Sequence, residues 1–286
     1  MPSIKIINKK IISLKSTRKI TRAMKMISAT KLRKAQEALS QTKLYEQELN
    51  EFIQRLVGGQ SISHPLYKPH LVVRNVHLLV FTSDRGLCAG FNANAIKKAI
   101  ALVNDLKTKE ITYTLSFFGK RGFEFFRKKS YPVQEHHAGV INSPSYAAAE
   151  KIGSALIDKF LKHQLDEVYL VYNDFKSAIA QVPSLKKLLP FVPEKIEWTV
   201  KRKDFLFEPS PKEILNAFAL RTVKFFIYRT LLTSITAEQA ARMTAMDSAT
   251  NNCGDLIDQY TLKRNKMRQA AITKELVEIV SGAESL

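Results

Sequence analysis

Residues 3–36 read SIKIINKKIISLKSTRKITRAMKMISATKLRKAQ, a stretch with no glycine, no proline and no acidic residue. The run without glycine or proline continues to Val57. Because these two residues are the ones that end helices, their absence predicts a single helix over residues 3–57. At about 1.5 Å per residue this helix would span roughly 80 Å, far longer than an ordinary globular helix. Such a helix must pack along another helix or another chain.

A second segment with few helix breakers occupies the C-terminal end. Residues 212–253 and 255–281 contain neither glycine nor proline, and only Gly254 separates them. This predicts a long C-terminal helix that continues through Gly254 at a cost of about 1 kcal/mol. The alternative is that Gly254 caps a helix end. The distribution of breakers predicts three domains: a helix in residues 1–57, a central α/β domain in 58–211 and a helix in 212–286.

The apolar residues of the first helix follow the spacing of a coiled coil. The frame begins at Ile4, Ile7, Ile11 and Leu14. It resumes at Leu32, Ala35, Leu39, Leu49, Ile53 and Leu56. In between, it is occupied by Arg18, Thr21, Lys25 and Ser28. We therefore expect the apolar stripe to shift in this stretch to Ile20, Met24 and Ile27, with a local change of supercoil.

The chain is strongly basic, with 45 Lys and Arg residues against 26 Asp and Glu residues and a formal net charge of +19. Eleven of the basic residues precede Glu37, the first acidic residue. Such an excess indicates an anionic partner: nucleic acid, anionic lipid or an acidic protein surface. Since no run of 18 apolar residues occurs, we expect no membrane-spanning helix and no secretory signal.

The middle of the sequence alternates between strand-like and helix-like segments. Strands are predicted at 76–82, 112–118 and 167–173, and an extended segment at 196–207. Helices are predicted at 92–106, 122–128 and 145–163, the last capped by Ser143 or Ser145. Because strands that alternate with helices form parallel βαβ units, we expect a small α/β domain of roughly 150 residues.

Residues that could carry chemistry are few. The loop Ser83–Asn92 follows a strand and opens a helix, as phosphate-binding loops do, but it matches neither GxGxxG nor GxxxxGK[ST]. Cys88 has no evident general base, and His136 and His137 are expected in a polar loop. The two cysteines have no metal-ligand spacing, which favours a reducing compartment without a structural metal. We expect no cofactor; a nucleotide-binding enzyme and a nucleic-acid-binding coiled coil remain alternatives to a protein-binding role.

Four motifs resemble one family. The segments STRKITRAMKMI (16–27) and SATKLRKA (28–35) are similar to the N-terminal helix of F-type ATP synthase gamma subunits. SDRGLC (83–88), EQAARM (238–243) and RQAAITKEL (268–276) resemble its middle and C-terminal signatures, and EIVSGA (278–283) its tail. Ala89 replaces a glycine common in the family. No inserted cysteine pair of the plastid type is present, so the resemblance is to the bacterial type.

The resemblance implies an antiparallel coiled coil of the two terminal helices and a central Rossmann-like α/β domain. It implies a non-catalytic rotor shaft that couples proton flow to ATP chemistry at the β subunits. The implied partners are the α3β3 ring, the ε subunit and the c ring, and not nucleic acid. The implied location is peripheral, on the cytoplasmic side of the inner (plasma) membrane.

The resemblance also assigns contact residues. Contacts with the acidic lever of β fall to Lys19, Arg22 and Met24. Contacts with α/β loops fall to Arg242, Arg268, Gln269, Thr273 and Glu275. Contacts with the c ring fall to Phe205, Phe207 and Glu208, where phenylalanine stands at positions that are often tyrosine in relatives. The turn of Arg85, Gly86 and Cys88 is assigned to the ε-facing side.

Overall fold

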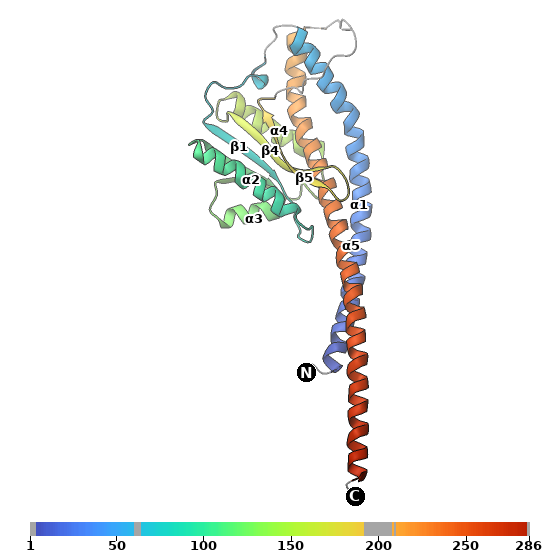
Figure 1. Cartoon of the computed structure of the whole chain (residues 1–286). Helices are drawn as coiled ribbons and strands as arrows, with labels where there is room; N and C mark the ends of the chain where they lie inside the picture. Colours follow the sequence, from blue (N-terminus) through green and yellow to red (C-terminus); the bar gives the residue numbers. More distant parts are fainter. Residues whose placement is uncertain (1–3, 60–63, 192–207, 209, 285–286) are drawn as a thin grey trace. The chain divides into compact units, whose positions relative to one another are not determined.

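The computed structural model describes residues 4–59, 64–191, 208 and 210–284. They belong to two compact units, Met1–Ala29 with Arg242–Leu286, and Thr30–Ala241. Helices α1 (Ile4–Gly59) and α5 (Pro211–Glu284) contribute to both units (Figure 1). The two breaker-poor segments are therefore continuous helices, and α5 passes through Gly254 without interruption, as predicted.

The unit Thr30–Ala241 contains a sheet with the strand order β3-β2-β1-β4-β5. Its strands are β1 (Asn75–Phe81), β2 (Thr112–Phe118), β3 (Val133–His137), β4 (Glu167–Phe175) and β5 (Gln181–Leu189). The first four strands in this order run parallel, and β5 pairs antiparallel with β4. The predicted parallel α/β core is confirmed, but sequence reasoning missed β3 and β5.

Helices cover both faces of this sheet, because the strand residues point alternately to opposite sides. Helices α2 (Phe91–Thr108) and α3 (Lys120–Lys128) pack on the face of Leu78 and Val80. Helix α4 (Tyr146–Leu161) and the parts of α1 and α5 in this unit pack on the face of Leu79 and Phe81. A short 3-10 helix (Pro65–Tyr67) joins this second core through Leu66. The result is a three-layered α/β unit (Figure 1).

Local sequence explains how the elements begin. Helix α4 is capped by the hydroxyl of Ser145, which accepts a hydrogen bond from the Ala148 amide at 3.2 Å, one of the two predicted caps. The turn before α3 requires glycine: Gly119 has φ +87°, and a Cβ there would lie 2.0 Å from the Thr82 carbonyl oxygen.

The extended segment predicted at 196–207 lies outside the described residues.

The histidine pair was placed wrongly from sequence. His136 and His137 do not lie in a loop; they end β3 and pair with Phe117 and Phe118 of β2. The His136 ring stacks on Phe123 with centroids 4.5 Å apart. Strand β3 lies at the edge of the sheet, where a strand can be polar. Its sequence VQEHH lacks the apolar residues by which the other strands were predicted.

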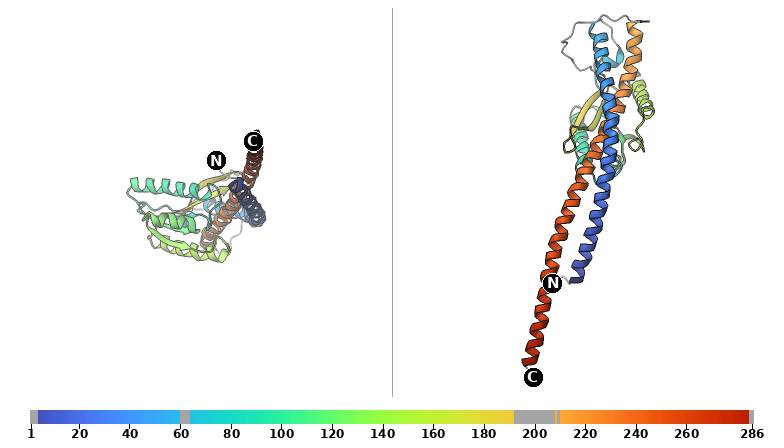
Figure 2. Two further views of the ribbon diagram at one scale, coloured as in Figure 1. Left: turned by 90° about the horizontal axis from the view of Figure 1, so that it is seen from below. Right: turned by 90° about the vertical axis from the view of Figure 1, so that its right-hand side faces the viewer.

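In the unit of residues 1–29 and 242–286, α1 and α5 lie side by side and antiparallel (Figure 2). Ile7 and Ile11 are buried with Ile257, as the predicted coiled-coil frame requires. Further along, Thr250 Oγ1 donates to Thr21 Oγ1 at 2.8 Å. Partner numbers thus fall along α5 as they rise along α1, which defines the antiparallel direction.

The predicted shift of the apolar stripe is wrong. The polar frame residues Thr21 and Ser28 are buried, at 8% and 2% exposure, whereas Ile20 and Ile27 are 61% and 58% exposed. The frame keeps its phase because α5 supplies polar partners: Thr250 for Thr21, and Asp247 for Lys25 at 2.6 Å. Polar side chains that are paired with each other can occupy the seam between two helices. Ile20 and Ile27 therefore remain on the exposed side of α1.

Candidate functional site

The outer face of α1 carries the basic residues that the resemblance assigns to the β lever. Lys19 and Arg22 are exposed and three residues apart, so they share one face of the helix. Met24 follows Arg22 by two residues, which places it about 200° around the helix, and it is half-buried. The structure therefore brings Lys19 and Arg22 together but separates Met24 from them.

An apolar stripe adjoins this basic face. Ile20 and Ile27 are seven residues apart, two helical turns, and both are exposed. The sequence pattern predicted that Ile20 and Ile27 form a stripe, but as part of the packed seam. They are exposed because polar residues occupy the seam instead. Exposed large aliphatic side chains in a row are typical of a surface that another protein covers.

The five residues of α5 assigned to α/β loops form two separate groups. Arg242 is buried, with 8% exposure. Arg268, Gln269, Thr273 and Glu275 are exposed and lie within eight positions of one another. At 1.5 Å per residue, about 39 Å of helix separate Arg242 from Arg268. The hydroxyl of Thr273 donates to the Gln269 carbonyl oxygen at 2.9 Å, so it is engaged within its own helix.

The C-terminal end of α5 exposes a dense set of large apolar side chains. Their exposures are 49% for Ile272, 57% for Leu276, 58% for Val277, 68% for Ile279 and 56% for Val280. They lie within nine consecutive residues, more than two helical turns. Burying these side chains against another protein is favourable by about 25 cal/mol per Å² of apolar surface removed from water.

The turn after β1 is closed by its own side chains. The Asn92 amide oxygen accepts a hydrogen bond from the Ser83 amide at 2.8 Å, and its amide nitrogen donates to Ser83 Oγ at 2.7 Å. The buried Cys88 packs with Phe91, Phe175 and the alanines of α5. Because these groups occupy the start of α2, the turn is a structural connection and does not present an open phosphate site.

The assigned turn residues differ in exposure. Arg85 is exposed, Gly86 is half-buried, and Cys88 is buried. A Cβ added at Gly86 would lie 3.5 Å from the Arg121 guanidinium. Leu87 and Ala89 adopt left-handed backbone, with φ of 65° and 47°. Asp84 accepts from the Lys120 amide at 3.0 Å and from the Asn142 side chain at 2.7 Å, which ties the turn to the start of α3.

The third assigned group is only partly described. Phe205 and Phe207 lie outside the described residues, and Glu208 is exposed in a bend. Within the described ranges no cluster of three or more His, Cys, Asp or Glu side chains is arranged to hold a metal. Among the described helices, none is both long enough and apolar enough to cross a membrane.

Solved structures with the same fold come from rotary machines. The chain aligns with a Euglena gracilis mitochondrial ATP synthase rotor chain at a TM-score of 0.62 and 15% identity, covering 94% of this chain and 98% of that one. A Tetrahymena thermophila mitochondrial ATP synthase central stalk/c-ring chain aligns at a TM-score of 0.57 and 24% identity, covering 80% and 99%. At these identities the likeness establishes the fold.

Sequence comparison establishes the family. The chain is similar to the ATP synthase gamma chains of Geobacter metallireducens, 39% identical, and Chlorobaculum tepidum, 41% identical, over all of this chain and 99% of each relative. That of Pelotomaculum thermopropionicum is 40% identical over the full length of both chains. The family model described as ATP synthase matches residues 3–286. With a match that spans both long helices and the sheet, the chain belongs to the ATP synthase gamma chain family.

Proposed function

We propose that this chain is the central rotor shaft of an F1Fo ATP synthase. Its role is to couple proton flow through a c ring to ATP synthesis or hydrolysis at the β subunits, without a catalytic residue of its own. The observation that carries this proposal is the end of α5, where five exposed apolar side chains within nine residues demand a covering protein. A ring of α and β subunits around a non-catalytic shaft provides that cover.

The basic face of α1 supports the proposal that an acidic surface of the β subunits drives the shaft. Lys19 and Arg22 project from a segment with eleven cations and no acid before Glu37. Exposed ion pairs are worth only about 0–1 kcal/mol each, so contacts of this kind can break and reform at every rotational step. Shaft angle and nucleotide affinity then bias each other reciprocally.

We assign the remaining contacts as the family motifs suggest. Met24 also contacts β, from another side of α1 than Lys19 and Arg22. The α/β loops contact Arg242, Arg268, Gln269, Thr273 and Glu275. The c ring meets Phe205, Phe207 and Glu208, and the turn of Arg85, Gly86 and Cys88 supports the ε-facing side.

We infer a functional division of the chain at the helix ends. Helix α1 ends at Gly59 and α5 begins at Pro211, which favours an α/β domain in residues 58–211 between helical segments 1–57 and 212–286. The chain acts peripherally to the membrane. We place it on the cytoplasmic side of a bacterial inner membrane, through its attachment to Fo.

The test is complementation of a bacterial strain that lacks its own gamma subunit. Inverted membranes that carry this chain should show ATP-driven proton pumping, and the chain should co-purify with the α, β and ε subunits. Membranes without it provide the background. Co-purification without restored pumping would refute the coupling role, and absence of co-purification would refute the shaft itself.

A further inference from the structure

Leu71 and Val72 form an apolar tip at one end of the sheet in the unit Thr30–Ala241. They lie at a bend between the short 3-10 helix and β1, and their side chains are 105% and 60% exposed. A single exposed leucine is ordinary on a protein surface, but here two consecutive aliphatic side chains project from one loop. The apolar tip is therefore a candidate contact with a partner outside this chain.

The loop is anchored on both sides of the apolar tip. Before the tip, His70 Nδ1 lies 2.7 Å from Asp166 Oδ1, and the His70 ring stacks on Phe160 with centroids 4.6 Å apart. After the tip, the Arg74 amide donates to Asp166 Oδ2 at 2.8 Å. Because one buried carboxylate holds both sides of the bend, the fold presents the tip in a defined position.

Lysine and arginine residues gather at the same end of the sheet. The parallel strands β1 to β4 begin here, since Asn75 of β1 pairs with Thr112 of β2 and Val76 pairs with Glu167 of β4. The helices α2, α3 and α4, which lead into β2, β3 and β4, therefore end here. We call the last turns of these helices and the loops that enter the four strands the basic edge. It comprises residues 68–74, 105–111, 125–132 and 158–166, with nine Lys or Arg and four Asp or Glu residues.

Much of this positive charge has no acidic partner within the chain. Two of the four acidic residues are engaged: Asp105 pairs with Lys109 at 2.8 Å, and buried Asp166 accepts from backbone amides. Four exposed cations have no acidic partner among the described residues: Lys68, Arg74, Lys128 and Lys162. Cations at helix C-termini also complement the helix dipole, but Lys68 and Arg74 lie in a loop, on either side of the apolar tip.

We propose that the apolar tip and the basic edge contact the anionic surface of the lipid bilayer in the assembled synthase. The inference rests on the proposed rotor function, which places this chain beside the membrane. Anionic headgroups attract clustered cations. A short aliphatic segment between such cations can enter the boundary between headgroups and acyl chains, where burial of apolar surface adds to the electrostatic attraction.

A lipid surface fits these features better than an acidic protein does. The cations come from four separate segments of the chain and are spread along the basic edge. An acidic protein would have to match each of them in position, whereas a bilayer supplies negative charge over its whole surface. A fluid bilayer also presents the same surface at every angle of a turning shaft, so contact with it favours no single rotational position.

Quenching of a fluorophore by lipids in proteoliposomes tests the contact. The complete synthase, with other exposed cysteines replaced, carries an environment-sensitive fluorophore on Val72→Cys. Ala93→Cys, exposed at the other end of α2, is the matched label position, and the native Cys88 and Cys253 are buried. The vesicles contain a lipid with a spin-labelled headgroup, in phosphatidylcholine with or without phosphatidylglycerol. We expect quenching at Val72 and not at Ala93, only with the anionic lipid, and its loss at 1 M NaCl, where the Debye length falls to about 3 Å.

Neutralising the cations beside the tip makes the test specific. Lys68→Gln with Arg74→Gln should lower the quenching of the Val72 label several-fold, because fewer cations then face the anionic surface. Lys97→Gln with Lys151→Gln removes two exposed cations of α2 and α4 outside the basic edge and should leave the quenching unchanged. ATP-driven proton pumping in the same vesicles shows that each variant chain is folded and assembled.

The outcomes separate this proposal from the rotor proposal. If the synthase pumps protons and the Val72 label is not quenched in anionic vesicles, the lipid contact is refuted while the rotor role stands. A label in an apolar environment that lipids do not quench would show that a protein covers the tip instead. Quenching that is equal in neutral vesicles, or that ignores Lys68→Gln with Arg74→Gln, refutes the contact equally. If the unmodified chain does not assemble with the other subunits, both proposals fall together.

Discussion

Lys25 Nζ of α1 lies 2.6 Å from Asp247 Oδ1 of α5, across a seam position that an apolar residue would occupy in a regular coiled coil. Both side chains remain partly exposed, at 41% and 46%. The pair lies one turn from the hydrogen-bonded Thr21 and Thr250. Together these contacts form a polar layer that fixes how the two helices pair.

Reversing one member of this ion pair should therefore weaken the helix pair. Lys25→Asp or Asp247→Lys alone places like charges together and should cost about 1 kcal/mol, whereas the double swap should recover most of that loss. The measurement is urea unfolding of the full chain at low and high salt. Single variants as stable as the double swap would show that the pair contributes nothing to register.

The strained turn after β1 offers a stabilising substitution. Ala89 has φ 47°, where a Cβ costs about 1–2 kcal/mol, and glycine has no Cβ. Because Ala89 is exposed, the change loses little packing. Ala89→Gly should raise the free energy of unfolding by about 0.5–1 kcal/mol after the entropy of glycine is included. Ala93→Gly, at an exposed position within α2, should lower the free energy of unfolding by a similar amount. If both variants lower the free energy of unfolding, the strain argument is contradicted.

Buried His77 predicts loss of stability in acid. Burial, followed by the nearby charges of Lys159 and His137, lowers the pKa of His77 from 6.5 to about 3. The unfolded chain therefore binds a proton that the folded chain excludes between pH 6.5 and about 3. The stability contributed by the neutral ring is complete above pH 6.5 and declines as the pH falls, by up to about 1.4 kcal/mol per pH unit.

His77→Gln should remove this contribution. The neutral amide can still reach toward Thr114, whose Oγ1 lies 2.7 Å from the His77 ring nitrogen. The difference between the unfolding free energies of wild type and variant, measured by urea titration, should shrink between pH 6.5 and pH 4. A difference that is constant over that range would mean that His77 is not the group that titrates.

A cation added to α1 at Met24, away from the face of Lys19 and Arg22, should impair coupling. Met24→Lys places a further positive charge near the acidic surface that we assign to β and creates a contact that must break at each step. ATP-driven proton pumping per ATP hydrolysed should fall. Gln41→Lys, at an exposed position about 25 Å further along α1, is the matched control and should have the smaller effect. An unchanged pumping ratio in Met24→Lys would contradict the contact.

The long helices and the parallel sheet could be predicted because they depend on local rules. Glycine and proline are absent from most of both helices, and the apolar strands β1, β2 and β4 alternate with helices. Strand β5 escaped because Pro183 and the lysines at 186 and 187 argue against a strand, although an edge position tolerates all three. Its antiparallel pairing with β4 depends on the hairpin between them.

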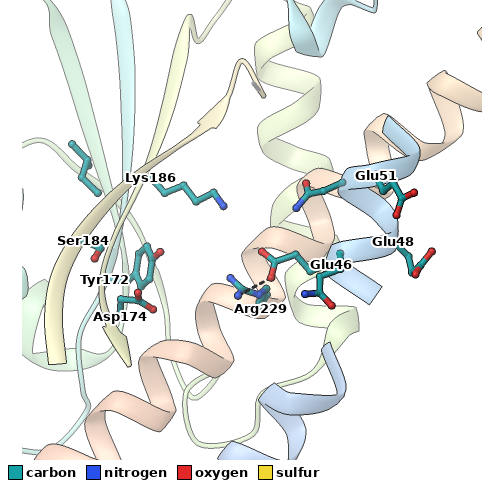
Figure 3. A pocket seen from close by; sticks show the side chains of 11 residues that line it. Glu46, Glu48, Glu51, Tyr172, Asp174, Ser184, Lys186 and Arg229 are labelled. Atoms are coloured by element: carbon teal, nitrogen blue, oxygen red, sulfur yellow. Dashed lines mark ion pairs between the residues drawn. The ribbon is translucent and has the colours of Figure 1, made fainter. Parts of the chain in front are cut away.

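The candidate contact surfaces were harder to predict because exposure depends on which residues meet across two helices. Thr21 and Thr250 are 229 positions apart, so no local pattern indicates that a polar pair fills the seam. Once it does, Ile20 and Ile27 face outward. The ion pair between Glu46 of α1 and Arg229 of α5, at 2.7 Å, is another case, since its members are 183 positions apart (Figure 3).

The rotor role is tested most directly by watching the chain turn. A cysteine replacing exposed Ala101 on α2 carries a bead, and the native Cys88 and Cys253 are buried at 2% and 8% exposure, so the unmodified chain is the labelling control. With the α and β subunits fixed to a surface and ATP supplied, we predict stepwise rotation of the bead in one direction. Sustained ATP hydrolysis with a stationary bead would contradict the account.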